Sequence, residues 1–143
     1  MIKVYSIKPV PAPRQVRKDK FNPSVSVLRY RAFRDEVRSR KIEIPIPFYH
    51  IIFILPMPKS WNKSKKETVL YQPHTQTPDK DNLEKALLDS VFQEDKHIHD
   101  GRVTKRWGKE GAIIISNTNL GVSSVHIQTY LDDNDNRSSG ELM

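Results

Sequence analysis

A dense group of acidic residues lies in the run TPDKDNLEKALLDSVFQEDKHIHD, which covers residues 77–100. Asp79 and Asp81 are two residues apart, and in extended backbone this spacing directs both carboxylates to the same side. Glu94 and Asp95 form a second acidic pair further along, where a tight turn would return them to the first pair. Mg²⁺ prefers oxygen ligands and keeps several waters, so a few carboxylates and a substrate phosphate make a complete site for it.

A helix is predicted to begin at Asp81, because the apolar residues that follow recur with helical spacing. On the opposite side, Asp81, Lys85 and Asp89 form an i, i+4, i+8 stripe. In this position Lys85 can stabilise the charge that develops on a phosphoryl group during cleavage. The residues also allow a structural explanation, in which Asp81 and Glu84 form a capping box and the stripe consists of surface ion pairs. The predicted buried face consists of Leu83, Ala86, Leu87, Ser90 and Val91.

The segment PDKDNLEKALLDSVFQEDKHI resembles the signature of the RusA family of crossover-junction endodeoxyribonucleases. In that family an Asp-x-Asp-Asn-Leu-x-Lys segment opens a helix, and an acidic pair followed by x-x-Ile or x-x-Val comes after it. The segments MPKSWNKSKK, QPHTQTPD and RVTKRWG also resemble members of the family. The similarity therefore extends over roughly residues 48–115.

The resemblance implies a role for the polar residues of this motif. It implies that Asp79, Asp81 and Asp95 are ligands of Mg²⁺, with Mn²⁺ as a substitute, and that these aspartates and Lys85 are catalytic. It also implies a homodimer that acts on branched DNA and resolves four-way (Holliday) junctions by paired nicks, in DNA recombination and repair.

The motif departs from the family pattern at the second acidic pair. Glu94 stands where family members commonly have the first of two aspartates, a change that keeps a carboxylate. The connection from Phe92 to Glu94 is shorter than in many members, because it lacks a Gly-aromatic step. This second departure bears on Asp95, whose distance from the first aspartate pair depends on the connection.

The chain of 143 residues carries a formal net charge of +7, from 24 Lys and Arg against 17 Asp and Glu. Its length fits one domain, and its charge favours a polyanionic partner. Nucleic acid fits better than a membrane, because no basic amphipathic helix with a broad apolar face is visible and the apolar stretch 48–55 is too short to span a bilayer. With no cysteine and no signal-peptide core, we expect a cytoplasmic protein, and the resemblance implies a bacterium or a phage as its source.

Basic residues gather in three segments around the acidic motif, and we expect them to contact DNA phosphates. One segment follows the prolines near the N-terminus, one is a lysine-rich loop over residues 56–77, and one is a strand that ends at Trp107. Trp61, in the middle of the loop, is predicted to anchor it to the domain, with stacking on an unpaired base as the alternative. The predicted DNA contacts are Arg14, Arg17, Lys63, Lys65, Lys66, Arg102, Lys105 and Arg106.

The predicted fold is a small α+β domain over residues 1–131 with a mixed β-sheet, in the order strand, helix, strand, helix, hairpin. Residues 125–131 alternate and favour an additional edge strand, and residues 132–143 are predicted to be a disordered, acidic and polar tail. The other predicted elements are a strand over 2–7, a helix from Asn22-Pro23 to about Arg40, a central strand over 48–55, the helix from Asp81, and a hairpin that joins 98–107 to 112–116.

The function predicted from these features is Mg²⁺-dependent hydrolysis of DNA phosphodiesters. Two alternatives remain open: a non-catalytic, basic nucleic-acid-binding protein, and a metal nuclease that acts on flaps or replication forks. No Walker motif or Gly-rich phosphate loop occurs, so no nucleotide cofactor is expected. His97 and His99 are two residues apart, but one carboxylate and two imidazoles without a further nitrogen or sulfur ligand make a weak zinc site.

Overall fold

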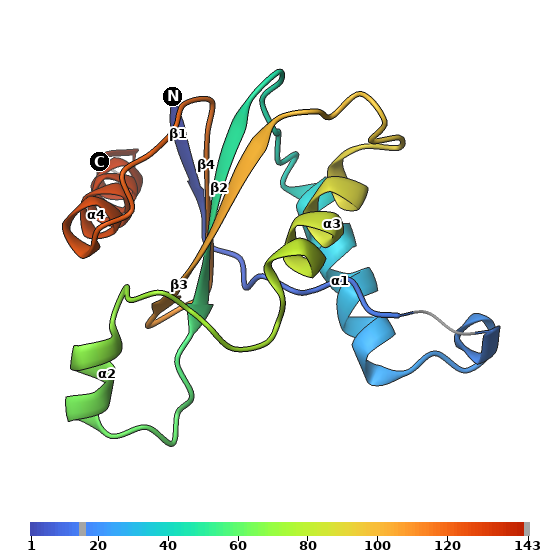
Figure 1. The fold of residues 1–143 in the computed structure, drawn as a ribbon, viewed down its shortest axis with the longest axis horizontal. Coiled ribbons are helices and arrows are strands. Elements are labelled where there is room, and N and C mark those ends of the chain that lie inside the picture. Colours follow the sequence, from blue (N-terminus) through green and yellow to red (C-terminus); the bar gives the residue numbers. More distant parts are fainter. Residues whose placement is uncertain (15–16, 142–143) are drawn as a thin grey trace.

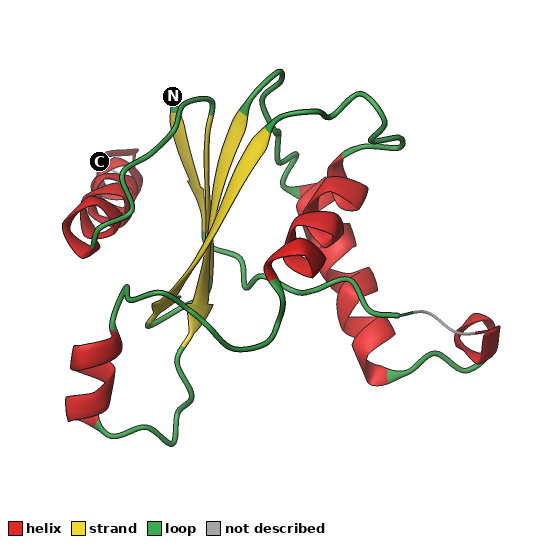
Figure 2. Ribbon diagram, in the orientation of Figure 1, coloured by secondary structure: helices red, strands yellow, loops and turns green. Residues whose placement is uncertain are grey.

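A mixed four-stranded sheet carries helices on both faces in the computed structural model, which describes residues 1–14 and 17–141. Figure 1 shows α1 and α3 on one face, α4 on the other, and α2 beyond one end of the strands. Figure 2 shows the same arrangement with helices, strands and loops in different colours, and this arrangement confirms the predicted α+β class. The elements are β1 (Ile2–Tyr5), the 3₁₀ helix η1 (Arg17–Lys20), α1 (Val25–Ser39), β2 (Tyr49–Pro56), α2 (Lys63–Val69), α3 (Lys80–Val91), β3 (Gly101–Gly108), β4 (Ala112–Ser116) and α4 (Ser124–Glu141).

The strand β2 lies inside the sheet, as predicted, and it separates the two strands that were expected to pair as a hairpin. The strand order is β1-β4-β2-β3, in which β2 is parallel to β3 and antiparallel to β4, while β4 is antiparallel to β1. The predicted hairpin of residues 98–107 with 112–116 is therefore wrong. The reason is the composition of β2, which is buried on both faces and is best covered with a partner strand on each edge.

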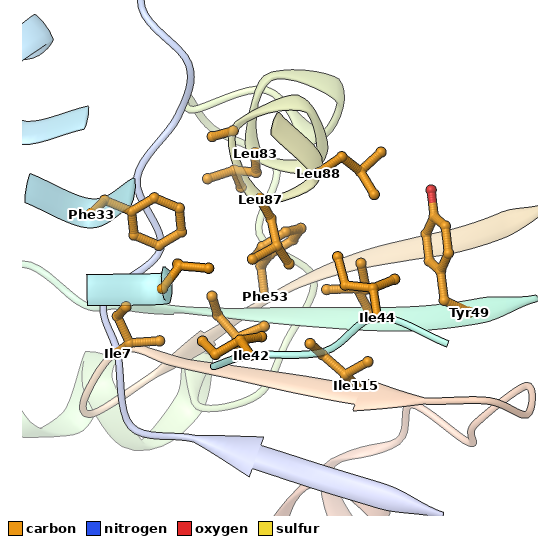
Figure 3. Packing of buried hydrophobic residues seen from close by; sticks show 14 of the residues in the cluster. Ile7, Phe33, Ile42, Ile44, Tyr49, Phe53, Leu83, Leu87, Leu88 and Ile115 are labelled. Carbon is orange, nitrogen blue, oxygen red and sulfur yellow. The ribbon is translucent and has the colours of Figure 1, made fainter. Parts of the chain in front are cut away.

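Successive residues of β2 enter two separate hydrophobic cores. On one face, Phe53 packs with Phe33 of α1 and Leu87 of α3, as Figure 3 shows. On the other face, Ile52 belongs to a second core that includes Ile127 of α4. Because side chains alternate across a strand, one continuous apolar strand supplies both cores. The core on the first face fixes the position of α3, the helix that carries the acidic motif.

The helix α1 begins two residues later than the Asn22-Pro23 signal predicts. Ser24 is the N-cap, and its hydroxyl accepts a hydrogen bond from the N–H of Val27 at 3.4 Å. Serine and asparagine are comparable N-caps, so the sequence does not decide between Asn22 and Ser24. The packing of the helix decides where it begins. Pro23 precedes the cap and is not the first helical residue.

The helix α2 occupies the middle of the segment that the sequence predicts as a lysine-rich loop. Asn62 is its N-cap and accepts a hydrogen bond from the N–H of Lys65 at 2.8 Å. None of its residues is buried, so the helix lacks the apolar face that hydrophobic periodicity detects.

The helix α4 replaces the edge strand predicted over 125–131. Ile127 and Leu131 are four residues apart and both contact the second core, a spacing that fits one face of a helix as well as it fits strand alternation. The helix continues to Glu141, through most of the segment predicted to be disordered, and residues 142–143 lie outside the described residues. Along the described chain, no helix combines the length and the apolarity needed to cross a membrane.

Candidate active site

The start of α3 exposes the carboxylates of Asp79 and Asp81. The helix begins at Lys80 rather than at Asp81, so Asp79 is its N-cap and Asp81 lies in its first turn. The Asp79 carboxylate accepts no capping hydrogen bond, although an aspartate at this position usually does. Asp81 accepts a hydrogen bond from the N–H of Asn82 at 3.0 Å. Within the described part of the chain neither carboxylate forms a salt bridge, and both residues are exposed to solvent.

The capping-box explanation of Asp81 and Glu84 is wrong. Asp81 is not the N-cap, and Glu84 accepts a hydrogen bond from the hydroxyl of Tyr49 at 2.6 Å. The structure therefore removes one of the purely structural roles that the sequence allows for Asp81.

Asp79 lines a groove of about 470 Å³ between the start of α3 and the proline-rich N-terminal segment. Lys8, Pro11 and Asn82 are also part of its lining. The N–H of Ala12 donates to the carbonyl of Asn82 at 3.0 Å, which fixes the N-terminal segment against the helix. An exposed carboxylate and a lysine thus lie along one groove, where a phosphate group and a cation can meet.

Two side chains from other elements hold α3 in place. The hydroxyl of Tyr49 in β2 donates to Glu84, and burial together with the nearby Glu84 carboxylate raises the pKa of Tyr49, so the hydroxyl stays protonated. The ring of Tyr49 lies over Gly101 so closely that a Cβ atom at residue 101 would overlap it. Arg38 of α1 donates through Nε to the carbonyl of Ser90 at 3.1 Å.

The segment 71–78 leads into α3, and its first residues, 71–74, run antiparallel along the outer edge of β3. The N–H of His74 donates to the carbonyl of Lys105 at 3.1 Å. The ammonium of Lys105 donates to the carbonyls of Gln76 and Pro78, both at 2.7 Å. These bonds fix the backbone that precedes Asp79, and with it the point from which the Asp79 side chain extends.

Lys85 lies one turn after Asp81 and is paired with Asp89. Its Nζ is 3.2 Å from Oδ2 of Asp89, with the lysine side chain 63% exposed and the aspartate side chain 34% exposed. The hydrogen bond and charge of Asp89 raise the pKa of Lys85, and the charge of Asp95 raises it further. Lys85 is therefore cationic at neutral pH and unsuited to remove a proton, but suited to stabilise negative charge.

The predicted metal ligands Asp79, Asp81 and Asp95 are not gathered into one cluster. Asp95 lies beyond the end of α3, in a turn where its carbonyl accepts the N–H of Ile98 at 2.9 Å. Among residues 1–14 and 17–141, no group of three His, Cys, Asp or Glu side chains lies close enough to hold a metal ion. The helix is about 18 Å long, and Asp95 is close enough to Lys85 to act on its charge.

The expected return of Asp95 to the first pair is therefore incomplete, and its role as a ligand stays a prediction. The donors at the start of α3, two exposed carboxylates, nevertheless fit a hard cation that keeps several waters.

The predicted DNA contacts on β3 lie in different environments. Arg102 is exposed, and its Nη1 donates to Oδ1 of Asn119 at 2.6 Å. Arg106 is half-buried, and burial lowers its pKa. Lys105 supports the backbone before Asp79. Of these residues, Arg102 presents its guanidinium most openly to a ligand.

The other predicted DNA contacts lie on α2 and near the N-terminus. Lys63 and Arg14 are exposed, Lys66 is half-buried, and Nζ of Lys65 lies 4.1 Å from the centre of the Trp61 ring. The side chain of Arg17 lies outside the described part of the structure.

Trp61 anchors its loop, as predicted, through an aromatic cluster. Its ring centre is 4.9 Å from that of Trp107, which in turn is 4.0 Å from that of His74. Since Trp107 and Lys65 both lie against the Trp61 ring, the anchor is favoured over the base-stacking alternative.

The buried residue His50 is a feature that the sequence analysis missed. Its Nδ1 accepts the N–H of Leu120 at 2.9 Å, and its Nε2 lies 2.9 Å from the hydroxyl of Thr104. Burial, with a smaller contribution from the charge of Arg102, lowers the pKa of His50 to about 4. The signal was available, because His50 is the one polar residue within an apolar strand.

A comparison with known protein families supports the resemblance that the acidic motif indicates. A family model described as Endodeoxyribonuclease RusA matches residues 7–116 of the 143. The match includes α1, α3 and the strands β2, β3 and β4, whereas β1 and α4 lie outside it. No curated protein sequence matches the chain.

Proposed function

The chain belongs to the RusA endodeoxyribonuclease family, and from this membership we propose that it is a metal-dependent nuclease that resolves four-way DNA junctions in recombination and repair. The family supports cleavage of DNA. The four-way junction as substrate, Mg²⁺ as the cofactor, the homodimer and the roles of individual residues are the further content of the proposal.

One observation carries the proposal: Asp79 is an N-cap whose carboxylate caps nothing and instead lines a groove. An aspartate with a purely structural role at this position would accept a backbone N–H, a bond worth about 1 kcal/mol to the helix. Its oxygens are available to a cation instead. Asp81, in the first turn of the same helix, offers a second exposed carboxylate.

We assign the binding of Mg²⁺, or of Mn²⁺ in its place, to Asp79 and Asp81, with Asp95 as the third ligand. Bound to these carboxylates, the cation would polarise a phosphoryl oxygen and lower the pKa of a bound water. Lys105 keeps the backbone before Asp79 fixed through two hydrogen bonds, so the first ligand is preorganised.

Lys85 acts in this proposal on the phosphoryl group. Its raised pKa keeps the ammonium charged, and a charged donor that faces the cleaved phosphodiester stabilises the negative charge that increases in the transition state. Asp89 pairs with Lys85 at 3.2 Å and restricts where the ammonium can lie.

A homodimer follows from the substrate. A four-way junction has approximate two-fold symmetry and needs two nicks at equivalent positions, whereas one chain has one acidic site; a C₂ dimer supplies two. In the described part of the sheet, β1 is an outer strand with one unpaired edge, and such an edge is a candidate interface. Analytical ultracentrifugation should give a dimer of the 16.6 kDa chain.

The test compares cleavage of a labelled four-way junction, a flap, a replication fork and a linear duplex, with and without Mg²⁺. We expect paired nicks in the junction that require the metal and that Asp81→Asn abolishes. The matched control is Asp35→Asn, which makes the same charge change at an exposed position of α1. Cleavage of the junction by Asp81→Asn at the wild-type rate would refute the assignment, and a preference for flaps or forks would replace the junction as substrate.

A further inference from the structure

Four lysines from three segments surround one cavity of about 530 Å³ at the end of the sheet. Lys59 follows β2, Lys63 and Lys66 belong to α2, and Lys109 lies in the turn between β3 and β4. We call this cavity, with these lysines, the lysine pocket. None of its lysines belongs to the groove beside Asp79.

The floor of the lysine pocket is apolar and fixed. Met57 and Leu70 line it, and Met57 is buried. The N–H of Met57 donates to the carbonyl of Gly108 at 3.0 Å, and the N–H of Leu70 donates to that of Lys66 at 3.0 Å. The long lysine stems can therefore rest on an apolar surface while their ammonium groups gather at the rim.

The charge of the lysine pocket is largely uncompensated. Glu67 also lines it and is 4.0 Å from Lys63, at the limit of an ion pair between two well-exposed side chains. In the part of the chain that the structure describes, Lys59, Lys66 and Lys109 form no salt bridge. Like charges that are held together repel one another, and an anion between them removes this repulsion. The pocket thus has the chemistry of a phosphate site.

Lys65 does not take part, although it belongs to α2. Its ammonium lies over the ring of Trp61, which packs on Trp107. This contact fixes α2 against the end of β3 and leaves Lys63 and Lys66 to face the cavity.

A path of ten residues, held in part by hydrogen bonds to β3, joins the lysine pocket to the candidate active site. Leu70 lines the pocket, Asp79 lines the other groove, and the first residues of the segment 71–78 between them follow the edge of β3. Ten residues span at most about 35 Å when extended. One strand of duplex DNA has a phosphate every 3.4 Å or so along its axis, so the two sites are at most about ten phosphates apart.

We propose that the lysine pocket binds a backbone phosphate of the DNA substrate, at most about ten positions from the cleaved bond. The inference rests on the proposed function, because the ligand is the DNA that the nuclease cuts. It adds Lys59 and Lys109 to the predicted contacts and removes Lys65 from those that touch the backbone. Through this contact one junction arm is held while the phosphodiester to be cleaved lies at Asp79.

The test measures binding of a four-way junction by fluorescence anisotropy without divalent metal, so that no cleavage occurs. The variant is the double substitution Lys59→Gln and Lys109→Gln, both at exposed positions. The matched control is Arg29→Gln with Lys41→Gln, which lowers the net charge equally at two exposed positions on and just after α1. We expect the slope of log affinity against log salt to fall by about one for the lost phosphate contact in the variant, and to change less in the control.

A scan of the junction with single methylphosphonates, each of which removes one phosphate charge, locates the contact. For the wild type we expect loss of affinity at one or two positions within about ten nucleotides of the cut, and for the double variant the same positions should have no effect. The substitution Glu67→Gln should strengthen binding at these positions, a gain that a folding defect cannot produce.

Three outcomes would overturn the proposal. The double variant and the control could show equal slopes, the methylphosphonate pattern could be unchanged in the variant, or inorganic phosphate could bind the pocket while no DNA position responds. Cleavage by the wild type is measured separately. If the junction is bound through the pocket but never cut, the proposed nuclease function fails and the phosphate site stands. If the junction is cut and no methylphosphonate position affects binding, the nuclease function stands and the phosphate site fails.

Discussion

Protonation of His50 should destabilise the protein in mild acid. The imidazole is fully buried in β2, where Nδ1 accepts the N–H of Leu120 and Nε2 lies beside the hydroxyl of Thr104. A nitrogen that accepts a hydrogen bond carries no proton, so the neutral ring with its proton on Nε2 fits both contacts. Protonation at Nδ1 would break the bond to Leu120 and place a charge inside the sheet, near Arg102.

The sign and size of the effect follow from the pKa values. Burial lowers the pKa of His50 from its ordinary value of 6.5 to about 4. Between these values the unfolded chain binds more protons than the folded chain, so the contribution to stability is complete above about pH 6.5 and is lost as the pH falls toward 4. Each pKa unit corresponds to about 1.4 kcal/mol, which makes the loss about 3 kcal/mol at most.

Urea unfolding between about pH 7 and pH 4.5 measures this loss. Glutamine can accept the N–H of Leu120 and donate to Thr104 without titrating, so His50→Gln should lose most of the pH dependence that wild type shows in this range. The control is His97→Gln, at an exposed histidine. His74 is also buried, and burial lowers its pKa, so a smaller dependence remains in the variant.

A direct measurement covers the case in which His50→Gln does not fold. The imidazole signals of His50 in NMR spectra of the wild type should stay unchanged until the pH is well below 6. Titration of His50 near pH 6.5 would refute the reasoning, as would equal pH dependence in the wild type and His50→Gln.

Three further predictions concern the candidate site and its support. Replacing Lys85 with Ala should lower the single-turnover cleavage rate on the order of 10²-fold or more, with little change in metal affinity. It should cost little stability, because the ion pair with Asp89 is largely solvent-exposed. A change only in the dissociation constant for DNA would reduce Lys85 to a phosphate contact. Replacing Tyr49 with Phe leaves Glu84 without its donor and should lower the free energy of unfolding by about 1–3 kcal/mol in urea, and no change would show that water replaces the hydroxyl. Junction binding should weaken steeply with salt between about 50 and 200 mM, and a log–log slope near zero would show that the basic residues are not the DNA surface.

The sequence determined the local features of the candidate site. The spacing of Leu83 and Leu87 places the helix α3, and the same periodicity places Lys85 one turn after Asp81. The residues of this motif are close together in the chain, so short-range geometry decides their arrangement and the family signature can be recognised in them. The continuous apolar character of β2 likewise predicts a central strand.

The tertiary structure decided what depends on contacts between distant segments. The hairpin prediction failed because β2 pairs with both β3 and β4, and neither strand by itself indicates this partner. The helix α4 replaced a predicted strand because Ile127 and Leu131 fit both periods, and only the second core on the far side of the sheet distinguishes them.

The same distinction holds for the charged residues. Composition shows an excess of lysine, but not that Lys105 supports the backbone before Asp79 while Lys65 covers Trp61. Nor does the sequence show that Lys59 and Lys109, fifty residues apart, meet at one cavity. Side chains at such separations are brought together by the sheet register and by the packing of α2 against β3, and these depend on the whole fold rather than on any segment of it.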